Sequence, residues 1–228
     1  MEANVNTQKV SGEKPSLFGM ITSPSLQFER MKSSNAVWGA FWIMALLTGI
    51  VGAIGGYVNS QTPEAIKANQ QLGLEVSPGV SAGYGFALVF FGSIIGFFII
   101  AAVYKVLMML MGNDTTYKKL LTIIVYTGII SVIGGLINAL LALVFDGNGK
   151  EMYTSLGPLF ASSGGVVHGI AKSIEIFGIW GLVVTGLGLQ ITAGLSKKQA
   201  TIIVVVFFII SLAFGAIGGL VSGLVPKV

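Results

Sequence analysis

The sequence predicts an all-α membrane protein, a bundle of five transmembrane helices with a short N-terminal amphipathic helix. Of its 228 residues, 54% are hydrophobic and only 10% are charged, whereas a soluble domain carries roughly a quarter charged residues. An α-helix of about 20 apolar residues crosses the hydrocarbon core of a bilayer. Five stretches have this character, at residues 36–58, 86–111, 121–145, 170–193 and 200–225.

The chain divides into a polar tail, an amphipathic segment and a membrane domain. We expect residues 1–16 to be disordered and residues 36–226 to form the five-helix domain. Between them, residues 17–35 mix apolar and polar side chains, and Pro24 after Ser23 suits the first turn of a helix. This interfacial segment either lies on the membrane surface, where Arg30 and Lys32 meet lipid phosphates, or caps the bundle.

The two longer loops lie on the same side of the membrane. In the first, Thr62 is a helix N-cap, Pro63 suits the first helical position and Gly73 closes the helix. The second loop, residues 146–169, opens with a glycine-rich turn at 146–149 and continues into an apolar stretch. We prefer an interfacial segment to a re-entrant loop, because backbone at membrane depth needs cover from protein or water.

The placement of positive charge predicts the orientation. Lysine and arginine near the ends of spans favour the cytoplasm. The pairs Lys118-Lys119 and Lys197-Lys198 occupy the two short turns that share a side with the N-terminus. The N-terminus is therefore predicted to be cytoplasmic and the C-terminus, after an odd number of spans, to lie outside.

Glycines at intervals of four are predicted to form helix-packing or partner interfaces. Small residues let backbones approach closely where lipid supplies little hydrophobic drive. The sequence Gly-Ala-Ile-Gly-Gly occurs in the first and last spans, which we attribute to packing rather than to paired transporter repeats. The candidate glycines are Gly52, Gly56, Gly92, Gly96, Gly215, Gly219 and Gly223.

Few polar side chains reach membrane depth. Lys105 lies near the inner end of its span and is expected to snorkel, and Asn138 can hydrogen-bond across helices. His168, Lys172 and Glu175 share one helical face by spacing, as an ion pair of Lys172 with Glu175 or as a proton relay. We find no catalytic, metal-binding or cofactor-binding pattern and no basic aromatic run for nucleic acid, so an enzyme is not expected.

Four segments resemble the Yip-domain (Ypt-interacting protein) family. They are the lead-in at 18–30, the span–turn–span at 104–121, the tryptophan-bearing segment at 174–180 and the turn at 187–200. The resemblance extends over about residues 17–225. It implies a bacterial plasma-membrane protein that assists an ABC exporter, with permease and adaptor subunits as partners, and so protects the cell against a secreted toxic peptide.

Two other functions stay open. One is a small transporter or channel with a sparse polar pathway near Asn138, His168 and Glu175. The other is a lipid-sensing or curvature-sensing scaffold that uses the N-terminal segment. Membrane lipids are expected neighbours in every case, and the glycine faces also suit a homo-oligomer.

Overall fold

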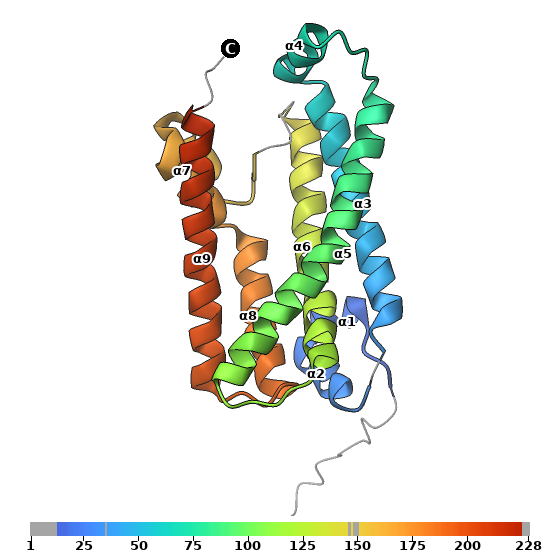
Figure 1. The fold of residues 1–228 in the computed structure, drawn as a ribbon, viewed down its shortest axis with the longest axis vertical. Helices are drawn as coiled ribbons and strands as arrows, with labels where there is room; N and C mark the ends of the chain where they lie inside the picture. The colour runs from blue at the N-terminus through green and yellow to red at the C-terminus, as the bar shows by residue number, and fades with distance from the viewer. Residues whose placement is uncertain (1–12, 35, 146, 148–150, 225–228) are drawn as a thin grey trace, which may run out of the picture.

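The computed structural model describes residues 13–34, 36–145, 147 and 151–224, without the side chains of Gly223 and Leu224. The polar tail at 1–12 and most of the expected turn at 146–149 lie outside this part. Four helices are long and apolar enough to span a membrane, and one apolar helix is shorter (Figure 1). The long ones are α3 (Trp38–Ser60), α5 (Pro78–Leu110), α6 (Tyr117–Val144) and α9 (Lys197–Leu224), and the shorter one is α8 (Ile176–Ile191). The described chain is thus an all-α bundle.

Helix α6 occupies the centre of the bundle. It contacts α3, α5 and α8, and most of its apolar window is buried. Few residues in the apolar windows of α5 and α9, by contrast, are fully buried. These two helices therefore present most of the surface that would face lipid.

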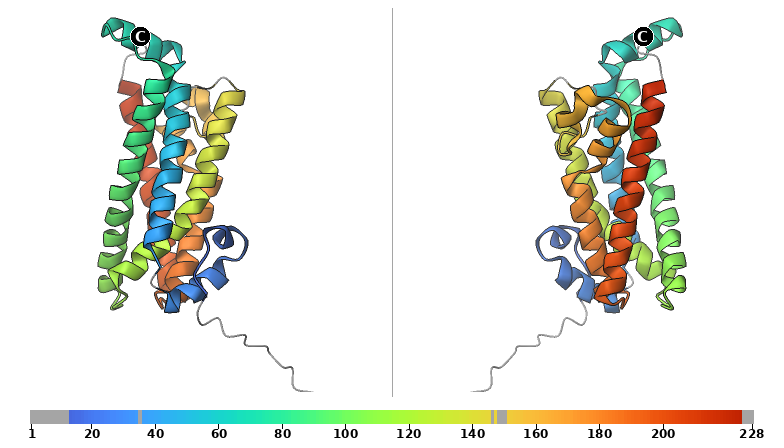
Figure 2. Two further views of the ribbon diagram at one scale, coloured as in Figure 1. Left: turned by 90° about the vertical axis from the view of Figure 1, so that its right-hand side faces the viewer. Right: turned by 90° about the vertical axis from the view of Figure 1, so that its left-hand side faces the viewer.

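The N-terminal segment folds into two short helices, α1 (Leu17–Thr22) and α2 (Pro24–Ser33), beside one end of the bundle (Figure 2). Phe28 and Met31 are fully buried, and the hydroxyl of Thr192 donates to the Phe28 carbonyl at 2.8 Å. The Tyr126 hydroxyl lies 3.2 Å from the carbonyl oxygens of Pro15 and Ala36, so it clamps both ends of the segment to α6. This is the arrangement expected of a cap that packs into the bundle.

Helix α4 (Pro63–Gln71) at the opposite end follows local sequence signals. The Thr62 hydroxyl accepts the Ala65 N–H, and Gly73 adopts a φ of 65° after the helix. Ser77 then caps α5, which begins at Pro78 rather than near residue 86. Its 33 residues rise about 50 Å, so α5 extends beyond a hydrocarbon core of about 30 Å.

The fourth expected span, 170–193, is not one helix. Helix α7 (Gly165–Ser173) ends before Ile174, and α8 begins after Glu175. The 16 residues of α8 rise only about 24 Å, less than a hydrocarbon core of about 30 Å. Both α7 and α8 pack against α9, so α7 and α8 together take the place of the expected fourth span.

Glycines bring two helix pairs into backbone contact. A Cβ on Gly52 or Gly85 would overlap the carbonyl oxygen of the other, which joins α3 to α5. The same relation holds between Gly169 of α7 and Gly215 of α9. These contacts need glycine because any side chain would separate the backbones.

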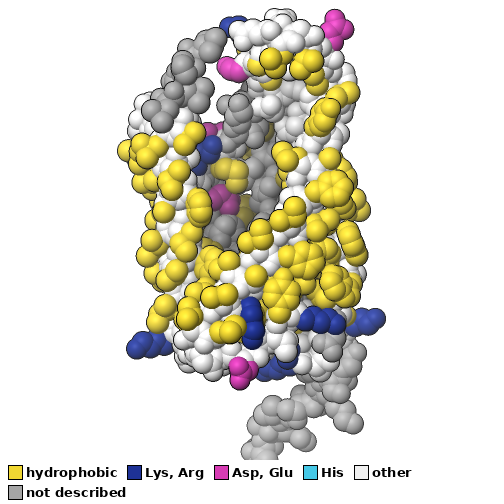
Figure 3. All heavy atoms as spheres, in the orientation of Figure 1, with side chains coloured by type: hydrophobic (Ala, Val, Ile, Leu, Met, Phe, Trp, Pro, Cys, Tyr) yellow, Lys and Arg dark blue, Asp and Glu magenta, His cyan; other side chains and the backbone are white. Residues whose placement is uncertain are grey.

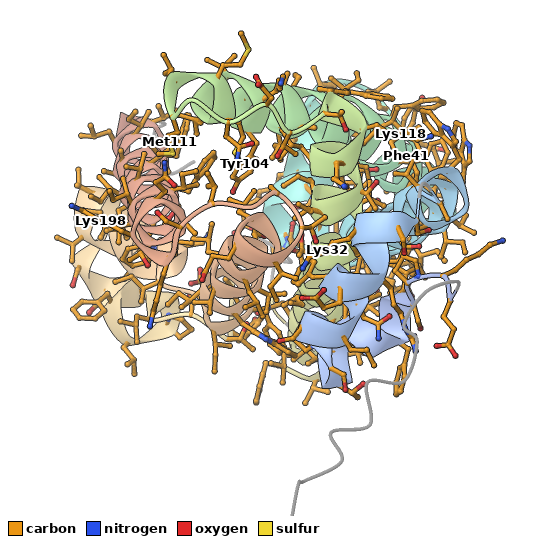
Figure 4. All side chains as sticks on the ribbon, turned by 90° about the horizontal axis from the view of Figure 1, so that it is seen from below. Lys32, Phe41, Tyr104, Met111, Lys118 and Lys198 are labelled. Carbon is orange, nitrogen blue, oxygen red and sulfur yellow. The ribbon has the colours of Figure 1, made fainter. Side chains whose placement is uncertain are left out.

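Positive side chains gather at the α2 end of the bundle (Figures 3 and 4). Lys32, Lys118 and Lys198 lie there, each from a different element (Figure 4). The ammonium group of Lys105 donates to the Thr115 carbonyl at 2.9 Å, so its side chain reaches the turn after α5. By the positive-inside rule, this end is the one predicted to face the cytoplasm.

Candidate functional site

The break between α7 and α8 places a buried carboxylate at a helix N-terminus. Glu175 is 8% exposed, and its Oε2 accepts the Gly178 N–H at 2.6 Å. Its Oε1 accepts the Thr154 hydroxyl, also at 2.6 Å. The positive end of the α8 dipole stabilises negative charge at this position. Glu175 is therefore the N-cap of α8 and not, as its spacing suggests, a member of the helix that carries His168 and Lys172.

Asn138 of α6 completes this polar network, which we define as Asn138, Thr154 and Glu175. The Asn138 side-chain amide donates to the Thr154 hydroxyl at 2.6 Å, and its carbonyl oxygen accepts the Thr154 N–H at 3.1 Å. The Ile176 N–H in turn donates to the Thr154 carbonyl at 3.2 Å. All the polar groups of Thr154 are thus satisfied by α6 and α8.

Through this network part of the 146–169 loop enters the bundle. Ser155 and Glu175 form an antiparallel bridge, and the Leu156 N–H donates to the Ile174 carbonyl at 3.1 Å. The 3-10 helix η1 (Gly157–Ser163) then returns to the surface, where Leu159 is 76% exposed. The loop therefore combines an inserted strand-like segment with a surface segment, whereas the sequence favours a wholly interfacial one.

A second group, the ion cluster, consists of Glu151, His168 and Lys172. The His168 Nε2 lies 3.0 Å from Glu151 Oε1, and the Lys172 Nζ lies 3.9 Å from Glu151 Oε2. All three side chains are only 20–29% exposed. Lys172 therefore pairs with Glu151, a residue that the sequence does not single out. No group of three acidic or histidine side chains suited to a metal ion occurs among the described residues.

Cavities adjoin both groups. A vestibule of 610 Å³ at the α4 end is lined by Thr62, Glu64, Glu151 and Tyr153, among others. A smaller cavity of 140 Å³ shares Glu151 with the vestibule and includes Asn138. Polar side chains therefore continue from the α4 end into the bundle.

A third cavity, the lateral cleft, lies between α5, α6, α8 and α9, and Thr48 of α3 also lines it. Its volume is 300 Å³, and its lining is mainly apolar with several hydroxyls, from Thr48, Ser93, Phe97, Ile100, Tyr104, Thr127, Ser131, Gly178, Gly181, Thr185 and Phe207 among others. The rings of Tyr104 and Phe207 stack at 4.7 Å and join α5 to α9 at the α2 end of the cleft. Above that contact Figure 3 shows a hollow between α9 and α5 with acidic and basic side chains inside it.

The candidate glycines fall into two groups. Gly52, Gly56, Gly215 and Gly219 each face backbone of a neighbouring helix closely enough to exclude a side chain. A Cβ on Gly92 or Gly96, in contrast, would meet nothing within 4 Å. The surroundings of Gly223 lie outside the described part.

Comparisons with known proteins agree with this architecture. The model of the Yip1 domain matches residues 18–219. The chain is 36% identical over 230 residues to the membrane protein YknW of Bacillus subtilis (strain 168), which covers 97% of this chain and 98% of that protein. No solved structure matches. On this similarity, the chain belongs to the Yip1-domain family of integral membrane proteins.

Proposed function

We propose that this protein is a non-enzymatic membrane accessory protein that assists the assembly or stability of an ABC-type efflux complex. Through that complex it contributes to protection against a secreted toxic peptide. Its partners are the permease and adaptor subunits of the exporter. The family resemblance suggests this role, and the similarity to YknW over nearly the whole chain supports it.

One surface of the structure carries the proposal: the exposed face of α5. Gly92 and Gly96 form a shallow groove on it, and Leu88, Ile95 and Ile99 around the groove are 58–76% exposed. Gly52 and Gly56, which have the same spacing, are covered by α5. The groove on α5 therefore has the shape that a transmembrane helix of the permease would fill.

A co-purification experiment tests this role. The chain is expressed with the permease and adaptor subunits of the exporter, and the amount of each that co-purifies is measured. Gly92→Leu together with Gly96→Leu adds bulk to the groove without a clash at either Cβ position, because no atom lies within 4 Å of it. We expect loss of permease from the complex and increased sensitivity of cells to the toxic peptide.

The matched control is Gly218→Leu on α9, which is also exposed and also has nothing within 4 Å. It should leave co-purification unchanged. Equal recovery of permease with the α5 double variant would refute the α5 interface. If the double variant instead changes only self-association of the chain, the groove serves a homo-oligomer.

The proposal includes a location and an orientation. We place the protein in the bacterial plasma membrane with the α2 end in the cytoplasm and the C-terminus outside. The lysines at the α2 end support this orientation. Under it, the vestibule opens to the outside, where an adaptor subunit would meet the α4 loop.

The second candidate, a small transporter or channel, gains support from the broken fourth span. Discontinuous helices that surround a polar site are common in transporters. Here the break lies beside the polar network and beneath the vestibule. Flux measured in proteoliposomes decides: dependence on Glu175 and His168, tested as Glu175→Gln and His168→Ala, would favour transport over the accessory role.

A further inference from the structure

Charged side chains lie at a depth where hydrocarbon would surround an ordinary span. Glu175 caps α8 about 24 Å from that helix's far end, so it lies within a hydrocarbon core of about 30 Å. Ionisable groups at such depth pair with one another or face a polar cavity. The Glu175 carboxylate is satisfied within the protein, whereas the ion cluster retains 20–29% exposure. Glu151 also lines the vestibule, so the ion cluster is accessible to a polar ligand.

The space beside these groups opens sideways. Helices α5 and α9 touch through the Tyr104–Phe207 stack, and above it they diverge to leave the hollow seen in Figure 3. Because α5 and α9 are also the most exposed apolar helices, this opening faces the bilayer. A ligand can therefore enter from the membrane.

The lateral cleft continues this space towards the α2 end. Gly178 lies at its upper end, directly beneath the Glu175 carboxylate, and Phe97 and Phe207 provide apolar walls. Gly181 leaves space in the wall of the lateral cleft, because a Cβ at this position would meet nothing within 4 Å. An apolar chain fits this cleft, with its polar end towards the charged groups.

We propose that the hollow and the lateral cleft together bind an aminophospholipid of the phosphatidylethanolamine type. One acyl chain lies in the lateral cleft between α5 and α9. The headgroup lies at the ion cluster, where the phosphate accepts from Lys172 and His168 and the ammonium donates to Glu151. This site goes beyond the proposed function, and it does not depend on any exporter subunit.

The chemistry of the cluster selects this headgroup. The Lys172 ammonium and the His168 imidazole each lie within 3.9 Å of the Glu151 carboxylate, so donors and an acceptor stand close together and match a ligand that carries a phosphate and an ammonium group. An anionic headgroup would leave Glu151 opposed by like charge. A trimethylated headgroup, as in phosphatidylcholine, has no N–H to donate to the carboxylate.

Native mass spectrometry of the purified full chain tests the proposal. The protein is exchanged into micelles that contain equal amounts of phosphatidylethanolamine, phosphatidylglycerol and phosphatidylcholine, and the retained lipid is counted. We expect phosphatidylethanolamine to be retained about tenfold more strongly than phosphatidylcholine, the factor of one charge-assisted hydrogen bond. Lys172→Met should weaken retention of phosphatidylethanolamine and phosphatidylcholine alike, because it keeps the apolar stem and deletes a donor to the phosphate that both lipids carry.

A second variant tests the acyl part of the site. Gly181→Leu narrows the lateral cleft and should reduce retention of every lipid, whereas the control Gly218→Leu should have no effect. Water-soluble glycerophosphoethanolamine should not compete, because it lacks the acyl chain. Equal retention of the three lipids, unchanged retention in both site variants, or full competition by the soluble headgroup would each overturn the proposal.

Discussion

Removing the Glu175 side chain is the sharpest test of how the broken fourth span is held together. In Glu175→Ala, the Gly178 N–H loses its capping acceptor and the Thr154 hydroxyl loses the carboxylate to which it donates at 2.6 Å. Both groups are then left inside the bundle. The inserted loop should separate from α8 as a consequence.

The magnitude follows from these two contacts. Loss of an N-cap costs about 1 kcal/mol, and a hydrogen bond to a charged group contributes about 1.5–3 kcal/mol. Since Glu175 is only 8% exposed, water replaces neither contact fully. We expect Glu175→Ala to lower the free energy of unfolding by about 3 kcal/mol. Glu175→Gln, which keeps one carbonyl oxygen, should lose about half as much.

The assay is unfolding of the detergent-solubilised protein in increasing mole fractions of a denaturing detergent, followed by circular dichroism. The control is Glu64→Ala, because Glu64 is exposed in the first turn of α4. It should lower the free energy of unfolding by no more than a few tenths of a kcal/mol. A midpoint for Glu175→Ala equal to that of the control would refute the view that this carboxylate holds the loop to the helix.

Three other outcomes are expected. Gly219→Leu should separate α7 from α9 and lower the thermal midpoint, because its Cβ would overlap α7 backbone, whereas Gly218→Leu should not; equal midpoints would contradict the glycine contact. Tyr126→Phe should destabilise the protein by about 1 kcal/mol and speed proteolysis of the N-terminal segment, since its hydroxyl contacts both ends of that segment; an unchanged cleavage rate would count against the clamp. The chain has no cysteine, so single substitutions report orientation: Gln70→Cys should react with a membrane-impermeant maleimide in whole cells and Ser33→Cys only after lysis, and the reverse pattern would invert the topology.

The long spans and the local caps are the parts of the fold that the sequence predicts well. A run of apolar residues is sufficient to identify α3, α5, α6 and α9 as membrane spans. The α4 helix is equally predictable, since Thr62 and Gly73 act on the backbone within a few residues of themselves. In both cases the information that decides the structure lies inside the element.

The break at Glu175 could not be predicted, because its cause lies elsewhere in the chain. Neither proline nor glycine marks the break, and the spacing of Lys172 and Glu175 suits an unbroken helix. The Thr154 hydroxyl bonds to Glu175 across 21 residues, and Thr154 is also fixed by Asn138. Helical hydrogen bonds at 174–175 are exchanged for bonds to an inserted loop, and an apolar loop sequence gives no sign of that exchange.

The sequence identifies candidate polar residues but not the residues to which they bond. Asn138 and Glu175 were identified separately, yet Thr154 is what joins them. Glu151, similarly, is the acid that collects His168 and Lys172. Both missed residues lie in the loop, where no helical period relates them to the spans. The general rule that a polar group inside the membrane requires a polar partner is the one signal that points to such residues.

The inserted loop gives the fourth span two properties that an unbroken helix lacks. Two backbone hydrogen bonds, from Leu156 N–H to the Ile174 carbonyl and from Ile176 N–H to the Thr154 carbonyl, cross the break, and Asn138 accepts the Thr154 N–H, so the loop replaces helical hydrogen bonds that the break removes. It also begins α8 at Ile176, two residues before Gly178, which lines the lateral cleft. The contacts that stabilise the break are therefore adjacent to the proposed lipid site. Loss of Glu175 should accordingly weaken both folding and lipid retention, whereas loss of Lys172 should weaken retention alone.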